Sequence, residues 1–324
     1  MTSPTADITV IIPFYNRETY IDEAVQSVLA QTLKPLEIII VNDCSKESSR
    51  RFLDRYADVC RILDLPRNVG LAGARNAGIN AARGKFIALL DDDDIWVPEK
   101  LELQYRYLQE HPTCAGVHTA VWMMMADLPD EGYKKFEPGP LPLSDALTHV
   151  QWVIPSTVLI RTEVVKAVGC FDPWFRENED RDFVVRCCAA GYRLVGIDEP
   201  LVRFRRTGHQ HLAGQHLTMY KSHVKLCWKH RALYYRVFGL SGPFGFLLQS
   251  AYLVIAGYVW DIRKTRKARF IQAIMWRLHQ VLSLKPTVRA DHKDPVTREG
   301  WSQGSNALRI EENPGALTSG TRSA

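Results

Sequence analysis

Three continuous apolar runs set the fold class of this chain: Ile8–Pro13 (ITVIIP), Glu37–Asp43 (EIIIVND) and Phe86–Leu90 (FIALL). A strand that is apolar at nearly every position, rather than at alternate positions, is typical of a sheet covered on both faces. The segments between these runs carry apolar residues at helical spacing, so strands and helices alternate. That order predicts an α/β fold with a mainly parallel sheet and helices on both faces.

The remaining elements are expected from shorter signals. Ser45 is a candidate N-cap of the second helix and Gly84 a candidate C-cap of the third. We expect helices over 14–32, 45–58, 70–84, 97–112 and 219–236, a short helix over 177–192, a weaker strand over 60–66, a strand over 114–124, a loop over 127–142, a strand followed by a helix over 156–169, and one or two strands over 193–206.

Polar residues follow each of the three apolar runs, and the most unusual of them are four consecutive aspartates, Asp91–Asp94. A solvated turn is one explanation, because Asp favours strand ends. However, ligands of open α/β sheets bind at the carboxyl ends of the strands, and three strand ends carry polar side chains here. Carboxylates hold Mg²⁺ or Mn²⁺, which bridge to substrate phosphates and neutralise a leaving diphosphate. The run therefore predicts a phosphorylated ligand bound through a divalent metal.

Composition narrows the class of protein. The formal charge of +5 over 324 residues is too small to indicate a nucleic acid partner. The seven cysteines lack CxxC pairs and a regular framework, which is typical of reduced thiols in the cytoplasm and disfavours zinc. The first ten residues contain no secretory signal pattern. The first strand is not followed by GxGxxG, which argues against a dinucleotide-binding fold.

The composition changes after residue 215. A basic, aromatic helix is followed by the uncharged stretch 237–260, the basic run 263–269 and an amphipathic stretch. This pattern favours contact with a membrane surface, with peripheral docking preferred over a true span. A helical hairpin packed on the rest of the chain, or on a second subunit, is the alternative. We expect a first domain over 1–215, a helical and membrane-associated region over 216–284, and a disordered tail over 285–324.

Five segments between about residues 7 and 206 together resemble the inverting family 2 glycosyltransferases of the GT-A fold. They are VIIPFYNRETYIDEAVQSVLAQT, EIIIVNDCS, NVGLAGARNAGINAARGKFIALLDDDDIWVPEKLELQ, GCFD and ENEDRDFVVRCCAAGYRL. The resemblance implies a GT-A nucleotide-sugar-binding fold, a nucleotide-sugar donor and a divalent metal. No QxxRW sequence, the mark of processive synthases in this group, is present, so we expect transfer of a single sugar.

The resemblance also implies a nucleotide site. Pro13 and Tyr15 would line the nucleobase pocket, and Asp43 would accept a hydrogen bond from the base, which favours uracil and hence UDP. The segment that approaches the nucleotide would contribute Gly70, Arg75 and Asn76. The second strand ends in NDCS where the family often has DDGS, so Cys44 stands where a glycine usually makes the turn.

The acidic residues match the family's metal and catalytic positions. Asp93 would be the direct metal ligand, with Asp91 as a second candidate ligand. Asp91 and Asp92 would contact the ribose or hold metal-bound water, and Asp94 would be structural. Asp180 in ENEDRDF would be the catalytic base that takes the proton of the acceptor hydroxyl, and Glu179 would help to position the acceptor. Helix capping by these acids is the alternative. The acceptor site or a lid would involve Trp152, Ser156, Thr157, Arg205, Arg206, His209 and His211.

These features predict an enzyme that adds one sugar to a glycan or lipid-linked acceptor for surface polysaccharide or glycolipid, in the cytoplasm or on the inner face of the cell membrane. A sugar-1-phosphate nucleotidyltransferase should instead show a glycine-rich loop after the first strand, and PFYNRE has no glycine. An inactive nucleotide-binding protein should have lost acids that this chain keeps.

Overall fold

The computed structural model describes residues 5–125, 133–134, 138–148, 153–206 and 213–239. Its centre is a mixed sheet with the strand order β3-β2-β1-β4-β9-β6-β10-β5, in which β7 pairs with β6 and β8 with β10. The strands are β1 (Thr5–Phe14), β2 (Lys34–Asn42), β3 (Arg61–Asp64), β4 (Phe86–Leu89), β5 (Ile95–Trp96), β6 (Cys114–Met125), β7 (Tyr133–Lys134), β8 (Gly139–Pro140), β9 (Leu159–Arg161) and β10 (Arg193–Arg206).

The N-terminal half of the sheet is parallel, as the apolar runs predict. Strand β1 pairs in parallel with β2 and with β4, and β2 pairs in parallel with β3. Beyond β4 the direction changes, because β9 runs antiparallel to both β4 and β6. Strand β10 is one long strand rather than two, and it pairs in parallel with β6 through register shifts near Pro200.

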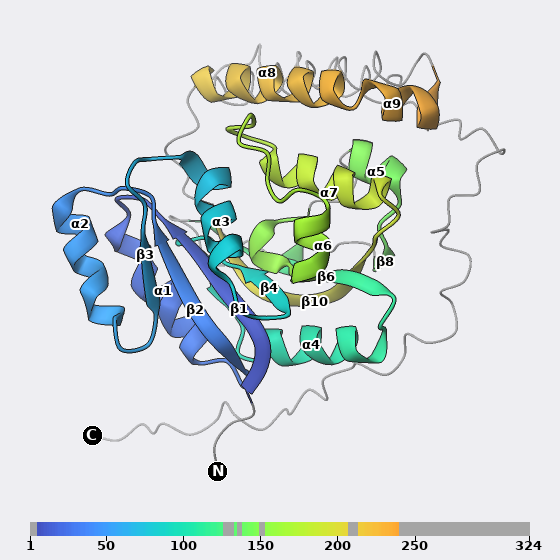
Figure 1. Ribbon diagram of the computed structural model, residues 1–324. Coiled ribbons are helices and arrows are strands. Elements are labelled where there is room, and N and C mark those ends of the chain that lie inside the picture. The colour runs from blue at the N-terminus through green and yellow to red at the C-terminus, as the bar shows by residue number, and fades with distance from the viewer. Residues whose placement is uncertain (1–4, 126–132, 135–137, 149–152, 207–212, 240–324) are drawn as a thin grey trace, which may run out of the picture.

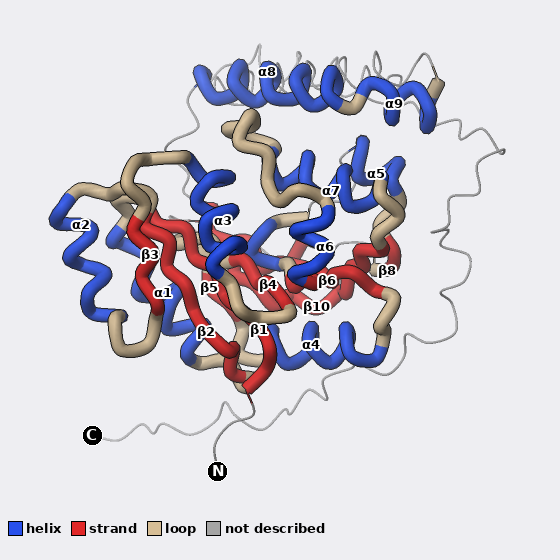
Figure 2. The backbone as a smooth tube through the Cα atoms, viewed as in Figure 1, coloured by secondary structure: helices blue, strands red, loops and turns tan. Residues whose placement is uncertain are grey.

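Helices cover both faces of this sheet (Figure 1). They are α1 (Glu18–Leu29), α2 (Glu47–Phe52), the 3-10 helix η1 (Leu53–Tyr56), α3 (Gly70–Ala81), α4 (Lys100–Glu110), α5 (Leu143–Thr148), the 3-10 helix η2 (Pro155–Thr157), α6 (Thr162–Ala167), α7 (Glu179–Ala189), α8 (Ala213–Lys229) and α9 (Arg231–Phe238). The hydrophobic core accordingly has two parts. One part contains side chains of α1, η1 and α4, and the other contains side chains of α3, α5, α6 and α7. The strands lie between these layers (Figure 2).

Two expected helix caps are wrong. The N-cap of α2 is Lys46 rather than Ser45, whose hydroxyl instead accepts a hydrogen bond from the backbone N–H of Asn16 at 3.1 Å. Helix α3 ends at Ala81, so Gly84 is not its cap. Gly84 lies against β1, where an added Cβ would come within 2.5 Å of the backbone nitrogen of Thr9. Close packing against a strand, and not chain reversal, therefore explains this glycine.

The C-terminal part of the described chain is a helical layer on the α5–α7 side (Figure 1). The single helix expected over 219–236 is two helices, because His230 interrupts them. The hydroxyl of Tyr234 in α9 donates to the carbonyl oxygen of Leu147 at 2.7 Å, which fixes this layer to α5. Within the described chain, no helix combines the length and apolarity needed to cross a bilayer. Residues 240–324, with most of the uncharged stretch and the expected tail, lie outside the described residues.

Candidate active site

The carboxyl ends of β1, β2 and β4 meet at one edge of the sheet. Phe14 is in register with Asn42, and the backbone N–H of Leu90 donates to the carbonyl oxygen of Ile11 at 3.0 Å. Tyr15 follows β1 with half of its surface exposed, whereas Pro13 is buried within the strand. The three polar segments that follow the apolar runs therefore lie side by side, as expected.

Asp43 ties the end of β2 to the start of α3. Its two carboxylate oxygens accept the backbone N–H groups of Val69 at 2.7 Å and Gly70 at 2.9 Å. Gly70 has a φ of 76°, a left-handed conformation that favours glycine. The neighbouring Cys44 is also left-handed, with a φ of 57°, at the position where a glycine was expected. Each oxygen of Asp43 retains a second lone pair, so contact with a nucleobase stays a prediction.

Arg75 joins the two acidic segments. Its guanidinium is buried and donates to Asp91 at 2.7 Å and to Glu179 at 2.8 Å. Burial alone would lower the pKa of Arg75, but the facing carboxylates of Asp91 and Glu179 raise it above its ordinary value. An ion pair of this kind, away from water, is held in one geometry. Arg75 thus fixes the start of α7 against the end of β4, and a direct nucleotide contact stays a prediction.

The four aspartates have different environments. Asp94 is buried and accepts the backbone N–H of Arg205 at 3.0 Å, in keeping with a structural role. Arg17 donates to Asp92 at 3.0 Å and to Asp93 at 2.7 Å. Burial raises the pKa of Asp92 to about 7 despite Arg17, and burial together with Asp91 raises the pKa of Asp93. Carboxylates in such surroundings are stabilised in their charged form by a cation.

The donor set fits a divalent metal. Asp91, Asp92 and Asp93 present carboxylate oxygens, which Mg²⁺ and Mn²⁺ prefer, and Arg17 is a cation that already lies against two of them. Among the described residues, no group of three or more His, Cys, Asp or Glu side chains converges on one point. A metal held by one or two carboxylates with substrate phosphates completing its shell needs no such group.

Glu179 and Asp180 begin α7, after Asn178 in a left-handed conformation with a φ of 65°. Asp180 is half-buried and borders a largely apolar cavity of about 20 Å³, which is room for one water molecule. Burial raises the pKa of Asp180, and burial followed by the adjacent Asp180 raises the pKa of Glu179 to about 7. A carboxylate with a raised pKa in a recess is suited to accept a proton.

Several other expected site residues have structural partners. The side-chain amide of Asn76 donates to the carbonyl oxygen of Phe171 at 2.7 Å and accepts its N–H at 2.9 Å. Ser156 and Thr157 are fully buried: the hydroxyl of Ser156 accepts the N–H of Asp91 at 3.0 Å, and that of Thr157 donates to Ile154 at 2.6 Å. Asn76, Ser156 and Thr157 thus form hydrogen bonds with backbone groups around the site. Their contacts with donor or acceptor stay predictions.

The expected lid residues are only partly described. Arg205 lies at the end of β10, where its Nε donates to the carbonyl oxygen of Asp93 at 3.1 Å and its Nη2 contacts Glu23 at 2.8 Å. This places Arg205 beside the aspartates, and its role in a lid over the diphosphate stays a prediction. The backbone of Arg206 ends β10, and its side chain is outside the described part. Trp152, His209 and His211 also lie outside the described residues.

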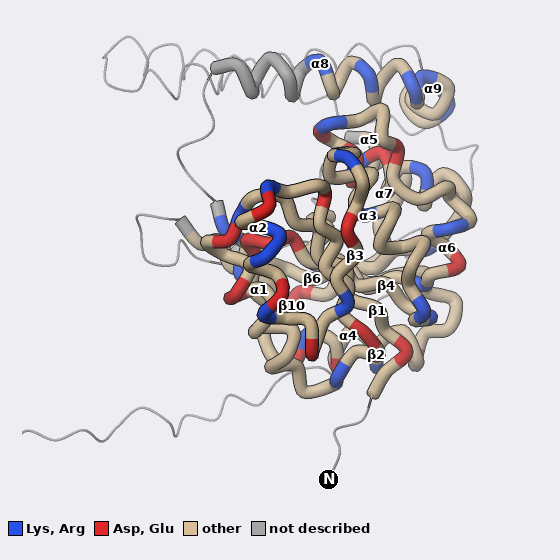
Figure 3. The backbone as a smooth tube through the Cα atoms, turned by 60° about the vertical axis from the view of Figure 1, so that its left-hand side comes forward, with Lys and Arg blue, Asp and Glu red and all other residues tan. Residues whose placement is uncertain are grey.

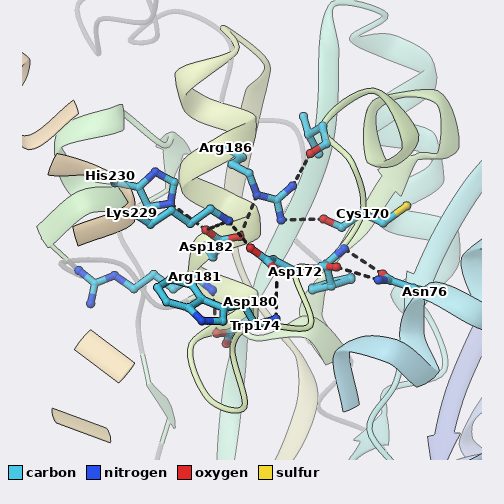
Figure 4. Close-up of polar contacts among 12 residues, drawn as sticks. Asn76, Cys170, Asp172, Trp174, Asp180, Arg181, Asp182, Arg186, Lys229 and His230 are labelled. Atoms are coloured by element: carbon cyan, nitrogen blue, oxygen red, sulfur yellow. Dashed lines mark hydrogen bonds and ion pairs between the residues drawn. The ribbon is translucent and has the colours of Figure 1, made fainter. Parts of the chain in front are cut away.

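Sequence reasoning missed two features of this site. Arg17 gave a signal, since it is a cation three residues after β1, at the edge where the aspartates lie. The second is Asp182, which is fully buried on α7 between Arg186 at 2.8 Å, Lys229 at 2.7 Å and His230 at 2.8 Å (Figure 4). Burial opposes ionisation, but the hydrogen bonds from His230 and Lys229 lower the pKa of Asp182 to about 2.

Comparison with known proteins agrees with this architecture. Residues 9–166 match the family model described as glycosyl transferase family 2. A Bacillus subtilis glycosyltransferase whose name assigns it to teichuronic acid biosynthesis, TuaG, is 32% identical over 202 residues, which are 61% of this chain and 78% of that protein. The succinoglycan biosynthesis protein ExoO of Rhizobium meliloti is 34% identical over 183 residues, 55% of this chain and 51% of that protein.

Solved structures show the same fold at low identity. The crystal structure of S. aureus TarS 1-349 has a TM-score of 0.59 and 19% identity, and the match covers 83% of this chain and 77% of that one. The mannosyltransferase PcManGT of Pyrobaculum calidifontis, solved with GDP-Man and Mn²⁺, has a TM-score of 0.54 and 15% identity, with 85% and 80% covered. The expected GT-A fold is confirmed, and the chain belongs to glycosyl transferase family 2 as a glycosyltransferase.

Proposed function

We propose that this glycosyltransferase moves one sugar from a nucleotide-diphosphate sugar, with UDP as the favoured nucleotide, to an acceptor hydroxyl with inversion and with a divalent metal. The observation that carries the proposal is the Arg75 bridge, whose ion pairs with Asp91 at 2.7 Å and Glu179 at 2.8 Å join the aspartate run to the start of α7 at the carboxyl edge of the sheet. Solved neighbours hold UDP-GlcNAc and GDP-Man, which supports a nucleotide-sugar donor in general terms.

Asp93 and Asp91 would hold the metal, and Asp92 would contact the ribose or a water on the metal. When bound, Mg²⁺ or Mn²⁺ supplies positive charge that stabilises the departing diphosphate. Arg75 keeps Asp91 in place through its 2.7 Å ion pair. Arg17 and Arg205 add positive charge beside the same carboxylates, so the site is prepared for a diphosphate.

Asp180 is the proposed catalytic base. Its carboxylate takes the proton from the acceptor hydroxyl while that oxygen forms a bond to the anomeric carbon and the bond to the diphosphate breaks. Attack from the face opposite the leaving group inverts the configuration. Glu179 is paired with Arg75 and is thereby committed to positioning, whereas Asp180 borders the cavity. This difference supports Asp180 over Glu179 as the base.

The acceptor we propose is a glycan or a lipid-linked hydroxyl in surface polysaccharide or glycolipid assembly, used by a peripheral protein on the cytoplasmic face of the cell membrane. The names of TuaG and ExoO refer to two such polysaccharides and support this class.

A binding experiment with a matched control tests the site. We expect UDP with Mn²⁺ to raise the melting temperature of the wild type, because a ligand that binds only the folded state stabilises it by mass action. The gain should vanish in Asp93→Asn and persist in Asp58→Asn, an exposed aspartate after η1. If no nucleoside diphosphate stabilises the wild type with or without metal, the proposed donor class is wrong.

Product analysis tests the reaction itself. A nucleotide-sugar that stabilises the protein should be consumed with release of the nucleoside diphosphate, and the anomeric configuration of the product should be opposite to that of the donor. Retention of configuration would refute Asp180 as the base of a single displacement. Consumption of a nucleoside triphosphate and a sugar 1-phosphate, with release of pyrophosphate, would instead identify a sugar-1-phosphate nucleotidyltransferase.

A further inference from the structure

Helices α8 and α9 have one face turned into the protein. Leu226 and Tyr234 are fully buried on that face, together with His223 and Cys227. Lys229 also points inward, where its amine lies 2.7 Å from Asp172 and 2.7 Å from Asp182 (Figure 4). The inner side of α8 and α9 is therefore buried against the rest of the chain and is not available to a partner.

The opposite side is what we call the outer face, and it consists of Lys221, Lys225, Trp228, Arg231, Tyr235 and Arg236. From Lys221 to Tyr235 these residues recur at spacings of three and four, with Arg236 directly after Tyr235, so they share one side of the two helices. Trp228 is 65% exposed and Tyr235 is 61% exposed, which is far more than aromatic side chains usually leave to water. The guanidinium of Arg231 lies 4.7 Å from the centroid of the Trp228 ring.

All charged residues of the outer face are cations. Residues 213–239 contain no Asp or Glu, and four of their five Lys and Arg residues belong to the outer face, since Lys229 is turned inward. Figure 3 shows the resulting blue segments on α8 and α9 without a red one, whereas acids and bases alternate over the sheet domain. Trp174, from the loop before α7, extends the surface: it is 47% exposed and its ring lies 5.1 Å from the amine of Lys225.

We propose that the outer face docks on an anionic membrane surface. Charge complementarity selects this occupant, because Lys and Arg are attracted to acidic headgroups while Trp and Tyr rings settle at the interface between headgroups and acyl chains. A second copy of this chain would bring the same four cations against each other, which disfavours a symmetric dimer through this face. The inference rests on the peripheral placement in the proposed function and assigns it to specific residues.

The position of this surface suits a membrane-bound acceptor. Helices α8 and α9 lie directly over α7, whose first residues are Glu179 and Asp180 (Figure 1). Asp182, two residues after Asp180, is the point at which α7 is fixed to Lys229 and His230. Docking through α8 and α9 would therefore hold the proposed base, Asp180, one helix layer from the lipid headgroups. The hydroxyl of a lipid-linked acceptor lies close to those headgroups.

Co-sedimentation of the full-length protein with vesicles tests the proposal. Wild type should bind vesicles that contain phosphatidylglycerol, bind pure phosphatidylcholine vesicles much more weakly, and dissociate at high salt. Lys221→Gln with Arg236→Gln removes two outer-face cations that form no hydrogen bond or ion pair with another described residue, and we expect roughly fivefold weaker binding per cation. Trp228→Ala should also weaken binding. The matched control, Arg51→Gln with Arg106→Gln, removes two exposed cations from α2 and α4 and should bind like wild type.

Several outcomes would overturn the proposal. Failure of the wild type to bind anionic vesicles would do so, and so would equal binding to both kinds of vesicle. Equal binding by wild type and the outer-face variants would assign the membrane contact to residues beyond 239. A dimer that Trp228→Ala dissociates in analytical ultracentrifugation would identify a second copy as the occupant. Donor consumption with a water-soluble acceptor should be unchanged in the outer-face variants, so failure of docking and failure of catalysis are separate results.

Discussion

Arg17 occupies the position from which a cation would bind Asp92 and Asp93, and removing it should change the affinity of the site for metal. Its Nη1 lies 3.0 Å from Asp92 and 2.7 Å from Asp93, while its side chain is 43% exposed. Because Arg17 and a divalent metal compete for the same oxygens, Arg17→Gln should tighten binding of Mn²⁺ in the absence of nucleotide. Partly exposed ion pairs contribute about 0.2–1 kcal/mol each, so two pairs correspond to a roughly 2- to 30-fold lower Kd.

The pH of this measurement matters. Burial already raises the pKa of Asp92 to about 7 with Arg17 in place, and loss of the guanidinium raises it further. Protons would then compete with Mn²⁺ at neutral pH and hide part of the gain. Titration above pH 8, with free Mn²⁺ followed by electron paramagnetic resonance, should reveal the full difference. The control Arg17→Lys keeps the positive charge and should leave the Kd close to that of the wild type.

Weaker or unchanged Mn²⁺ binding in Arg17→Gln at high pH would refute this reasoning. Unchanged binding would mean that the metal does not use the oxygens of Asp92 and Asp93. Weaker binding would mean that Arg17 orders the two carboxylates for the metal and does not compete with it. If Mn²⁺ binding were weaker in both Arg17→Gln and Arg17→Lys, the shape of the Arg17 side chain, and not its charge, would determine the affinity for the metal.

Three further changes have expected outcomes. Asp182→Asn should destabilise the fold by about 3–5 kcal/mol in urea denaturation, because it removes a fully buried carboxylate that pairs with Arg186 and His230, while Lys229 keeps Asp172. The lowered pKa of Asp182, about 2, means that its carboxylate stabilises the fold above the unfolded pKa near 4 and that this contribution is lost as pH falls toward 2; acid unfolding of Asp182→Asn should be correspondingly less steep in that window. Asp180→Asn should lower the rate of sugar transfer about 10²- to 10⁴-fold, while donor binding in a calorimeter stays intact. Gly84→Ala should cost about 1–3 kcal/mol in the same denaturation experiment, because the new Cβ meets the backbone of Thr9 at 2.5 Å.

The features that could be predicted from the sequence are local. Continuous apolar runs identified β1, β2 and β4, and the polar residues after each run identified the edge of the sheet that carries the site. The start of α7 could be predicted for the same reason, since Glu179 and Asp180 stand at the first turn of a helix whose apolar positions are regularly spaced. Such patterns involve neighbours within one turn or one strand, which a single sequence displays directly.

The features that could not be predicted depend on contacts between distant segments. The resemblance implied Asn76 as a residue of the segment that approaches the nucleotide, but the sequence did not show that its amide pairs with the backbone of Phe171, 95 residues away. In the sequence Asp182 is one of several acids near the start of α7. Its partners are Arg186 on α7, Lys229 at the end of α8 and His230 directly after α8, and two of these three lie almost fifty residues away. The predicted N-cap of α2 was wrong for a similar reason, because the hydroxyl of Ser45 accepts a hydrogen bond from the backbone N–H of Asn16 instead. Tertiary packing decides these partners, and propensity does not.

The Arg75 bridge has a consequence for the order in which the enzyme becomes competent during synthesis. Asp91 follows Arg75 by 16 residues, but Glu179 follows it by 104. A nascent chain that has emerged only as far as residue 166, where the match to the family model ends, has the sheet edge and all four aspartates but lacks the acid that completes the bridge. In such a chain Arg75 keeps Asp91 but lacks Glu179, its second carboxylate partner. The bridge can therefore be completed only once α7 has been synthesised, and a chain truncated upstream of α7 should not hold Arg75 in its bridging geometry.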